Sequence, residues 1–207
     1  TAEADTESIT SDIGYAVAKA DGTKVITMSD GSTISGDITA AVFDANGNKI
    51  ITMSDGSTLR GDINSAILNA DGSKTITMSD DSTISGDIVS AITTADGSKI
   101  ITYADESTLS GDITNAISNA DGTKTITLTD GSTFTGAISQ AVVDATGTKV
   151  ITYADNSTLS GDIASAVVNA DGTKTIVMDG NNSTLSGDIV SAINATDGSI
   201  VVTMSDG

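Results

Sequence analysis

The sequence predicts a repeat protein, a solenoid-like stack of mixed β-structure with short helices. An apolar segment recurs every 25 residues, beginning at residues 25, 50, 75, 100, 125, 150 and 175 and closing at residue 201, one residue late because of an insertion within 179–182. No linker or change of composition interrupts the series. We therefore expect residues 1–207 to form a single tandem-repeat domain of eight units.

The first part of each unit is predicted to be a β-hairpin. Residues 24–28 are short and β-branched, residues 29–31 (Ser-Asp-Gly) form a turn, and residues 33–35 provide a second strand. Strand alternation then places Ile26, Met28 and Ile34 on the same face of the hairpin.

The second part of each unit, residues 36–45, has a different apolar period. Ile38, Ala41, Val42 and Ala45 lie at i, i+3, i+4 and i+7, which is typical of the apolar stripe of a short helix. A third strand, which would give an all-β solenoid, is the alternative. It is disfavoured because it would bury position 40, whose equivalents are mostly polar. We expect Ile26, Met28, Ile34, Ile38, Ala41 and Val42 to be buried.

Neither piece of the unit is stable alone, because such a helix is shorter than the ~12–15 residues that isolated helices need and a lone hairpin is marginal. Stacked neighbours must therefore create the core. A second signal has a period of 50: Ile50, Ile100 and Val150 alternate with Thr75, Thr125 and Thr175. This indicates that successive hairpins point to alternate sides of the stack.

The composition excludes several kinds of chemistry. The chain has no Cys and no His, which removes thiol nucleophiles, imidazole–zinc sites and Ser-His-Asp triads. A net charge of −19 would repel nucleic acids and anionic membrane surfaces, and no apolar run is long enough to enter a membrane. We expect no enzyme activity and no cofactor.

Acidic and basic residues recur at fixed repeat positions. Asp30, Asp55, Asp105 and Asp155 could supply oxygen ligands for weak Ca²⁺ binding, although ordinary Asp-Gly turns, which need no metal, are the favoured explanation. The row that includes Asp12, Asp37 and Asp62, from which Ala137 departs, is interpreted as helix N-caps. Lys24 and its equivalents are expected to form weak surface pairs with aspartates.

The two ends of the chain suggest a function. The segment around Ile9 and Ile13 matches a second strand followed by the start of the predicted helix. The segment containing Val201, Val202 and Met204 matches a first strand with its turn. One hairpin is thus divided between the termini, and each half is an edge that invites another strand. We expect a structural, secreted protein of an extracellular or cell surface, whose partner is itself: copies join head to tail into a filament. The alternatives are a stalk or binding segment of an adhesin, recognising glycans or Ca²⁺, and a closed ring of eight units.

Overall fold

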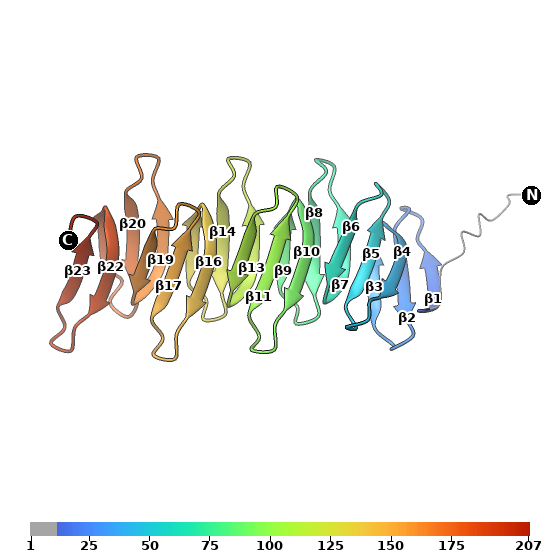
Figure 1. Cartoon of the computed structure of the whole chain (residues 1–207), viewed down its shortest axis with the longest axis horizontal. Coiled ribbons are helices and arrows are strands. Elements are labelled where there is room, and N and C mark those ends of the chain that lie inside the picture. The colour runs from blue at the N-terminus through green and yellow to red at the C-terminus, as the bar shows by residue number, and fades with distance from the viewer. Residues whose placement is uncertain (1–11) are drawn as a thin grey trace, which may run out of the picture.

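The computed structural model describes residues 12–207, which form a β-solenoid of strands stacked along one long axis (Figure 1). Every regular element in this part of the chain is a strand. The expected short helices are therefore wrong, and the all-β solenoid, the alternative interpretation, is the fold. Across residues 12–207 there is also no helix of the length and apolarity needed to cross a membrane.

Each unit contributes three strands. The first strands are β2 (Lys24–Met28), β5 (Lys49–Met53), β8 (Lys74–Met78), β11 (Lys99–Tyr103), β14 (Lys124–Leu128), β17 (Lys149–Tyr153), β20 (Lys174–Met178) and β23 (Ile200–Met204). The second strands are β3 (Thr33–Gly36), β6 (Thr58–Gly61), β9 (Thr83–Gly86), β12 (Thr108–Gly111), β15 (Thr133–Gly136), β18 (Thr158–Gly161) and β21 (Thr184–Gly187). The third strands are β1 (Ile13–Ala18), β4 (Ile38–Phe43), β7 (Ile63–Leu68), β10 (Ile88–Thr93), β13 (Ile113–Ser118), β16 (Ile138–Val143), β19 (Ile163–Val168) and β22 (Ile189–Asn194).

The chain builds two sheets alternately. A third, a first and a second strand in succession form an antiparallel meander, such as β1-β2-β3. A single residue, Asp37, then separates β3 from β4, which begins a meander in the opposite sheet. The 12-stranded sheet runs from β1 to β21 (sheet A), and the 11-stranded sheet runs from β23 to β4 (sheet B). This alternation confirms that successive hairpins point to alternate sides of the stack.

Neighbouring meanders of one sheet are joined by parallel pairing. In sheet A, the second strand β3 pairs with the third strand β7, and in sheet B β6 pairs with β10 in the same way. Each sheet is therefore a series of antiparallel meanders linked by short parallel joints.

A β-bulge explains why the third strand has the apolar pattern of a helix. Ile38 pairs with Met53 but Ala40 pairs with Thr52, so Thr39 is an extra residue in β4. A bulge leaves one residue unpaired and shifts the strand's alternation by one position. Ile38 and Ala41, three residues apart, consequently both face the core and are completely buried. The same bulge recurs in the other third strands.

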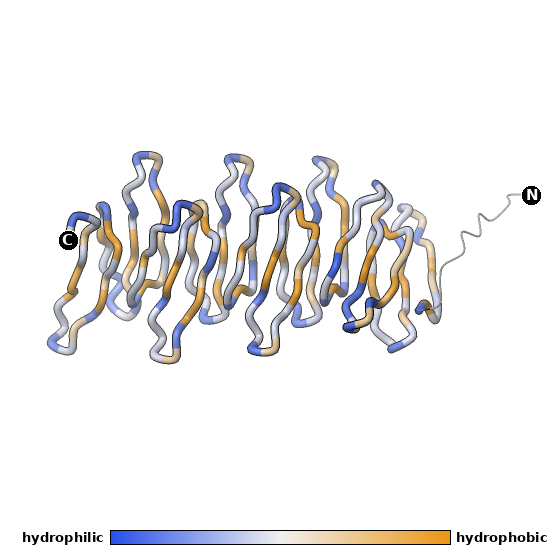
Figure 2. Tube along the Cα trace, in the orientation of Figure 1, coloured by the Kyte–Doolittle hydropathy of each residue, from blue (hydrophilic) through white to orange (hydrophobic). Residues whose placement is uncertain are grey.

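The core is one continuous apolar cluster between the two sheets. Apolar segments lie along the strands and hydrophilic ones at the turns (Figure 2). Of the six residues expected to be buried in the second unit, Ile26, Met28, Ile34, Ile38 and Ala41 are buried. Val42 is only half-buried, because the strand turns it to the outer face, and its equivalent Ile67 is 45% exposed.

The signal of period 50 distinguishes the outer faces of the two sheets. On sheet B, an apolar third-strand residue lies opposite an apolar first-strand residue, in the pairs Val42–Ile50, Ile92–Ile100, Val142–Val150 and Ile193–Val201. On sheet A, threonine replaces the first-strand partner in the pairs Ile67–Thr75, Ile117–Thr125 and Val167–Thr175, and Val17–Val25 is the exception. The solenoid thus has a more apolar and a more hydroxyl-rich side.

Candidate functional site

The residues expected to mediate assembly lie at the ends of the stack, except for Ile9, which falls outside the described residues. At one end, Ile13 in β1 is half-buried against the core. At the other, β23 leaves Val201, Val202 and Met204 exposed by 55%, 37% and 37%. The interior equivalents of Val202 and Met204, such as Ile51 and Met53, are completely buried. The core is therefore uncovered at its C-terminal end.

The aspartates considered as Ca²⁺ ligands lie in turns. Asp30 Oδ1 accepts hydrogen bonds from the backbone N–H and the hydroxyl of Ser32, at 2.9 and 2.7 Å. Asp55 and Asp155 bind Ser57 and Ser157 in the same manner, and Asp105 accepts from the Ser107 N–H. No group of three or more acidic side chains in residues 12–207 is arranged to hold a metal ion. Weak Ca²⁺ binding stays a prediction.

The row of aspartates interpreted as helix caps instead caps the parallel joints. Asp37 follows β3, and its Oδ2 accepts a hydrogen bond from the backbone N–H of Leu68, 31 residues further on, at 3.1 Å. Asp12, Asp62, Asp112 and Asp162 make the equivalent bond. Beside the cap, the strands approach so closely that a Cβ at Gly36 would lie 1.4 Å from the carbonyl oxygen of Ala66. We call these the close joints.

Two joints of sheet A have a different register. At the close joint between β3 and β7, the paired residues are 30 apart, as in Ser35 with Ser65. At β9–β13 and β15–β19 they are 32 apart, as in Thr83 with Asn115 and Thr133 with Ser165. At these shifted joints Asp87 and Ala137 occupy the capping position. The carboxylate of Asp87 accepts no backbone N–H hydrogen bond from residues 12–207 and forms an ion pair with Lys74 at 3.5 Å.

The shifted joints coincide with the tyrosines Tyr103 and Tyr153. Met53, Tyr103 and Tyr153 occupy the same repeat position. Met53 stands beside the close joint of Gly36, whereas Tyr103 stands beside Gly86 and Tyr153 beside Gly136, at the shifted joints. A Cβ added at Gly86 or Gly136 would lie 3.2 or 3.1 Å from a ring carbon of the tyrosine. The larger ring lies against the glycine, and the two strands still pair, with a register shifted by two residues.

The lysine row is buried, which corrects the expectation of surface pairs. Lys49, Lys74, Lys99, Lys124, Lys149 and Lys174 are each at most 9% exposed, because the inward alternation of the first strand places their stems along the rim of the core. Lys99 pairs with Asp80 at 2.7 Å, and Lys149 pairs with two aspartates. Among the described residues, Lys49, Lys124 and Lys174 have no carboxylate oxygen within ion-pairing distance.

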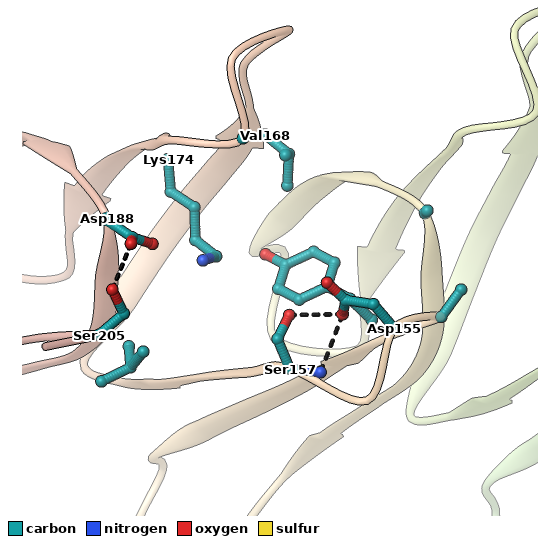
Figure 3. Close-up of a pocket in the computed structure, with 11 residues that line it drawn as sticks. Asp155, Ser157, Val168, Lys174, Asp188 and Ser205 are labelled. Carbon is teal, nitrogen blue, oxygen red and sulfur yellow. Dashed lines mark hydrogen bonds between the residues drawn. The ribbon is translucent and has the colours of Figure 1, made fainter.

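A cavity of about 390 Å³ lies beside the shifted joint of Tyr153 (Figure 3). Lys174 reaches into it, with Nζ 5.5 Å from the centre of the Tyr153 ring. Burial, reinforced by the nearby Asp155 carboxylate, raises the pKa of Tyr153 to about 12, so its hydroxyl is neutral at physiological pH. Further lining comes from Ala137, Ala154, Val168 and Val190 and from the polar side chains of Asp155, Ser157, Asp188 and Ser205.

A smaller cavity of about 200 Å³ lies at the same repeat position beside Tyr103. Lys124 Nζ is 4.9 Å from the Tyr103 ring centre, and the buried Tyr103 hydroxyl makes no hydrogen bond within the described part of the chain. Burial, offset in part by the neighbouring Ser118 hydroxyl, raises the pKa of Tyr103 to about 12. Asp87 and Ser118 stand here where the larger cavity has Ala137 and Val168.

The signals for these cavities are present in the sequence, but nothing in the sequence links them to a site. Tyr103 and Tyr153 recur with the period of 50, and Ala137 is the residue that departs from the aspartate row. The contribution of these residues to a cavity depends on the register of the parallel joints, which pair residues about 30 positions apart in the sequence.

Comparisons with known proteins do not identify a family. No protein-family model and no curated protein matches the chain. Among solved structures, the wild-type TCP10 domain of Danio rerio CPAP is 19% identical, with 93% of this chain and 85% of that chain covered and a TM-score of 0.23. The TCP10c domain of Drosophila melanogaster Sas-4 is 16% identical, with 92% and 98% covered and a TM-score of 0.18. A virginiamycin B lyase from Staphylococcus aureus is 8% identical, with 91% and 83% covered and a TM-score of 0.23. Likenesses at these TM-scores carry no argument about the function of this chain.

Proposed function

We propose that this chain is a structural, non-enzymatic protein of an extracellular surface, a rod that copies of itself extend head to tail into a filament. The observation that carries the proposal is the complementarity of the two ends. Sheet A ends in β21, a second strand, at one end and in β1, a third strand, at the other. Within the chain, every joint of sheet A pairs a second strand in parallel with a third strand.

A joint between copies would therefore repeat a joint that the chain already makes three times in sheet A. Met204 stands beside Gly187, so the joint would have the close register: by analogy with the pairing of Gly36 with Ala66, Gly187 of one copy would lie opposite Ala16 of the next. Ala16 is exposed, whereas its interior equivalents Ala41 and Ala66 are completely buried. Continuing the stack would also cover Val202 and Met204.

The shape of the molecule favours a filament over a ring closed by one chain. The stack is straight, and β1 and β23 lie at opposite ends of its long axis (Figure 1). The described ends of one molecule thus do not meet, and a second copy is the partner that fits both edges. Repeats of the same kind within a longer chain would make the same joint, which is the stalk arrangement.

The test uses one blocking substitution at each end, Ala16→Asp and Val202→Asp. Both residues are exposed in a single copy, so each variant should fold, but each would bury a carboxylate without a partner in the joint. We expect the unchanged chain to form filaments in electron micrographs and to sediment as a distribution of sizes, and each variant alone to sediment as a monomer. Ala70→Asp, which adds the same charge in an exposed turn, should still form filaments.

Mixing the two blocked variants gives the decisive outcome. The intact C-terminal end of Ala16→Asp can meet the intact N-terminal end of Val202→Asp, after which both outer ends are blocked. The mixture should therefore form dimers and nothing larger. Filaments in either variant alone, or a mixture that stays monomeric, would overturn the head-to-tail joint.

A further inference from the structure

We propose that the cavity beside Tyr153 binds a small aliphatic α-amino acid as its zwitterion. Lys174 would hold the carboxylate, Asp155 and Asp188 the ammonium group, and the apolar wall the side chain. The proposal is made for a single copy, since Asp188 and Ser205 follow β21 and β23 at the end of the stack where another copy would join.

The positive group of the cavity has no partner of its own. Lys174 is 6% exposed, and its Nζ lies 5.5 Å from the centre of the Tyr153 ring. Asp155 and Asp188 line the same cavity, but no carboxylate oxygen of residues 12–207 lies within ion-pairing distance of this Nζ. Removing an ammonium group from water without a counter-charge is costly. A ligand carboxylate would supply this counter-charge and accept charge-assisted hydrogen bonds.

The two acidic groups of the cavity retain capacity for a cation. Asp155 uses Oδ1 for both bonds from Ser157, at 2.8 and 2.6 Å, and Asp188 uses Oδ2 for the bond from the Ser205 hydroxyl. The hydrogen bonds of the described residues leave the other oxygen of each carboxylate free. Figure 3 shows Lys174 on the same side of the cavity as Asp188, with Asp155 across from them. A ligand with both charges is matched by this arrangement better than a ligand with one.

The apolar part of the lining sets the class of side chain. Val168, Val190, Ala137 and the Tyr153 ring form a wall without hydrogen-bonding groups apart from the tyrosine hydroxyl. The volume of about 390 Å³ is at the lower end of the range for small-molecule sites, which suits an amino acid such as leucine.

The smaller cavity shows what would prevent this binding. At Tyr103, Asp87 replaces Ala137 and Ser118 replaces Val168, and the volume is about 200 Å³. Each cavity is lined by two aspartates, but in the smaller one a carboxylate stands where the larger cavity has Ala137, part of the apolar wall is lost and the space is about half. We therefore expect the larger cavity alone to take the ligand.

The experiment is an NMR titration of protein carrying ¹³C-labelled valine methyl groups. L-leucine should shift the methyl signals of Val168 and Val190 until they saturate. 4-Methylpentanoate, which has only the carboxylate, and isoamylamine, which has only the ammonium group, should bind about ten-fold more weakly or worse, because each lacks one charge-assisted contact. Equal affinity for leucine and either analogue would overturn the zwitterion, and shifts confined to other valines would overturn the site.

Two variants test the assignment of the residues. Lys174→Met should weaken leucine binding about ten-fold or more, whereas Lys49→Met, at another buried lysine without a carboxylate oxygen within ion-pairing distance, should leave it unchanged. Ala137→Asp introduces the residue that the chain already carries at Asp87, so it should fold and lose the binding. Retention of full affinity in Ala137→Asp or Lys174→Met would contradict the proposal.

Discussion

Gly111→Ala tests whether the close joints hold the solenoid together. A Cβ at Gly111 would lie 1.6 Å from the backbone oxygen of Ala141 in the neighbouring meander. Real side-chain atoms cannot approach a backbone oxygen so closely, so the parallel joint between β12 and β16 would have to open. The backbone of Gly111 also has a φ of +138°, which alanine rarely adopts.

The expected loss is the sum of the contacts of this joint. Opening it would break the bond from the Asp112 N–H to the Ala141 oxygen at 3.1 Å and the bond from the Val143 N–H to Asp112 Oδ2 at 2.9 Å. These bonds contribute about 1 and about 2 kcal/mol, since one acceptor is charged, and the strained φ adds about 1–2 kcal/mol. We expect Gly111→Ala to lower the free energy of unfolding by about 4–5 kcal/mol.

Gly122→Ala is the matched control. Gly122 has a φ of +83° but no atom within 4 Å of the added Cβ, so only the conformational cost of about 1–2 kcal/mol applies. Urea unfolding measures both variants, and hydrogen exchange of the Val143 amide reports on the joint itself, because repeat stacks can unfold in parts. Equal destabilisation of the two variants, together with a Val143 amide that is still protected in Gly111→Ala, would refute the reasoning.

Three further substitutions have defined outcomes. Ile101→Asp should destabilise the protein by about 4 kcal/mol or more, because Ile101 is completely buried and the carboxylate would have no partner there; an unchanged thermal melt would contradict the packing. Glu106→Gly should raise the urea midpoint by an amount equivalent to about 1 kcal/mol, since Glu106 has a φ of +67°, which glycine adopts freely; a lower midpoint would argue against strain at this turn. Burial disfavours the charged form of Asp44, but hydrogen bonds from Asn48 and Arg60 outweigh it and lower its pKa to about 2. Because this folded pKa lies below the ordinary value of 3.8, Asp44 stabilises the fold above about pH 4 and this contribution is lost as the pH falls towards about 2. In thermal melts, the melting temperature of Asp44→Asn should therefore fall less between about pH 4 and pH 2 than that of the unchanged chain. An unchanged fall would show that Asp44 does not contribute to the acid dependence.

The repeat, the hairpins and the alternation of units were predictable because they depend on local patterns. Ile26, Met28 and Ile34 are buried as the strand period requires. The helix expected for the third strand is wrong because a bulge at Thr39 places Ile38 and Ala41 three residues apart on the same face. In a sequence, one bulged strand and one helical turn give the same spacing of apolar residues. They differ only in the presence of a partner strand, which the third strand finds in the next first strand.

The functions of the aspartate and lysine rows depend on contacts between units, which local patterns do not reveal. Asp37 bonds a backbone N–H 31 residues away, and Lys99 pairs with an aspartate 19 positions earlier in the opposite sheet. The repeat positions of these residues were evident, but their partners required the order of the strands. The same holds for the buried stems of the lysines, since the rim of the core exists only once two sheets face each other.

The tyrosines link the sequence signal to the cavities most directly. In the described joints beside a Met or a Leu, paired residues are 30 positions apart in the sequence, once the single insertion is discounted. In the two joints beside a Tyr, paired residues are 32 positions apart. A shift by two residues preserves which side chains face the core, because strand side chains alternate with a period of two. The stack can therefore accept the larger ring without exposing its core.

The shifted joints lose the hydrogen bond between the capping aspartate and a backbone N–H, and a space remains beside the tyrosine ring. At Tyr153 the capping residue is also an alanine, and the cavity there is about 390 Å³, against about 200 Å³ at Tyr103. A tyrosine at this repeat position thus accompanies a shifted joint with a cavity, and the larger of the two cavities is the one whose capping position is also changed from aspartate to alanine.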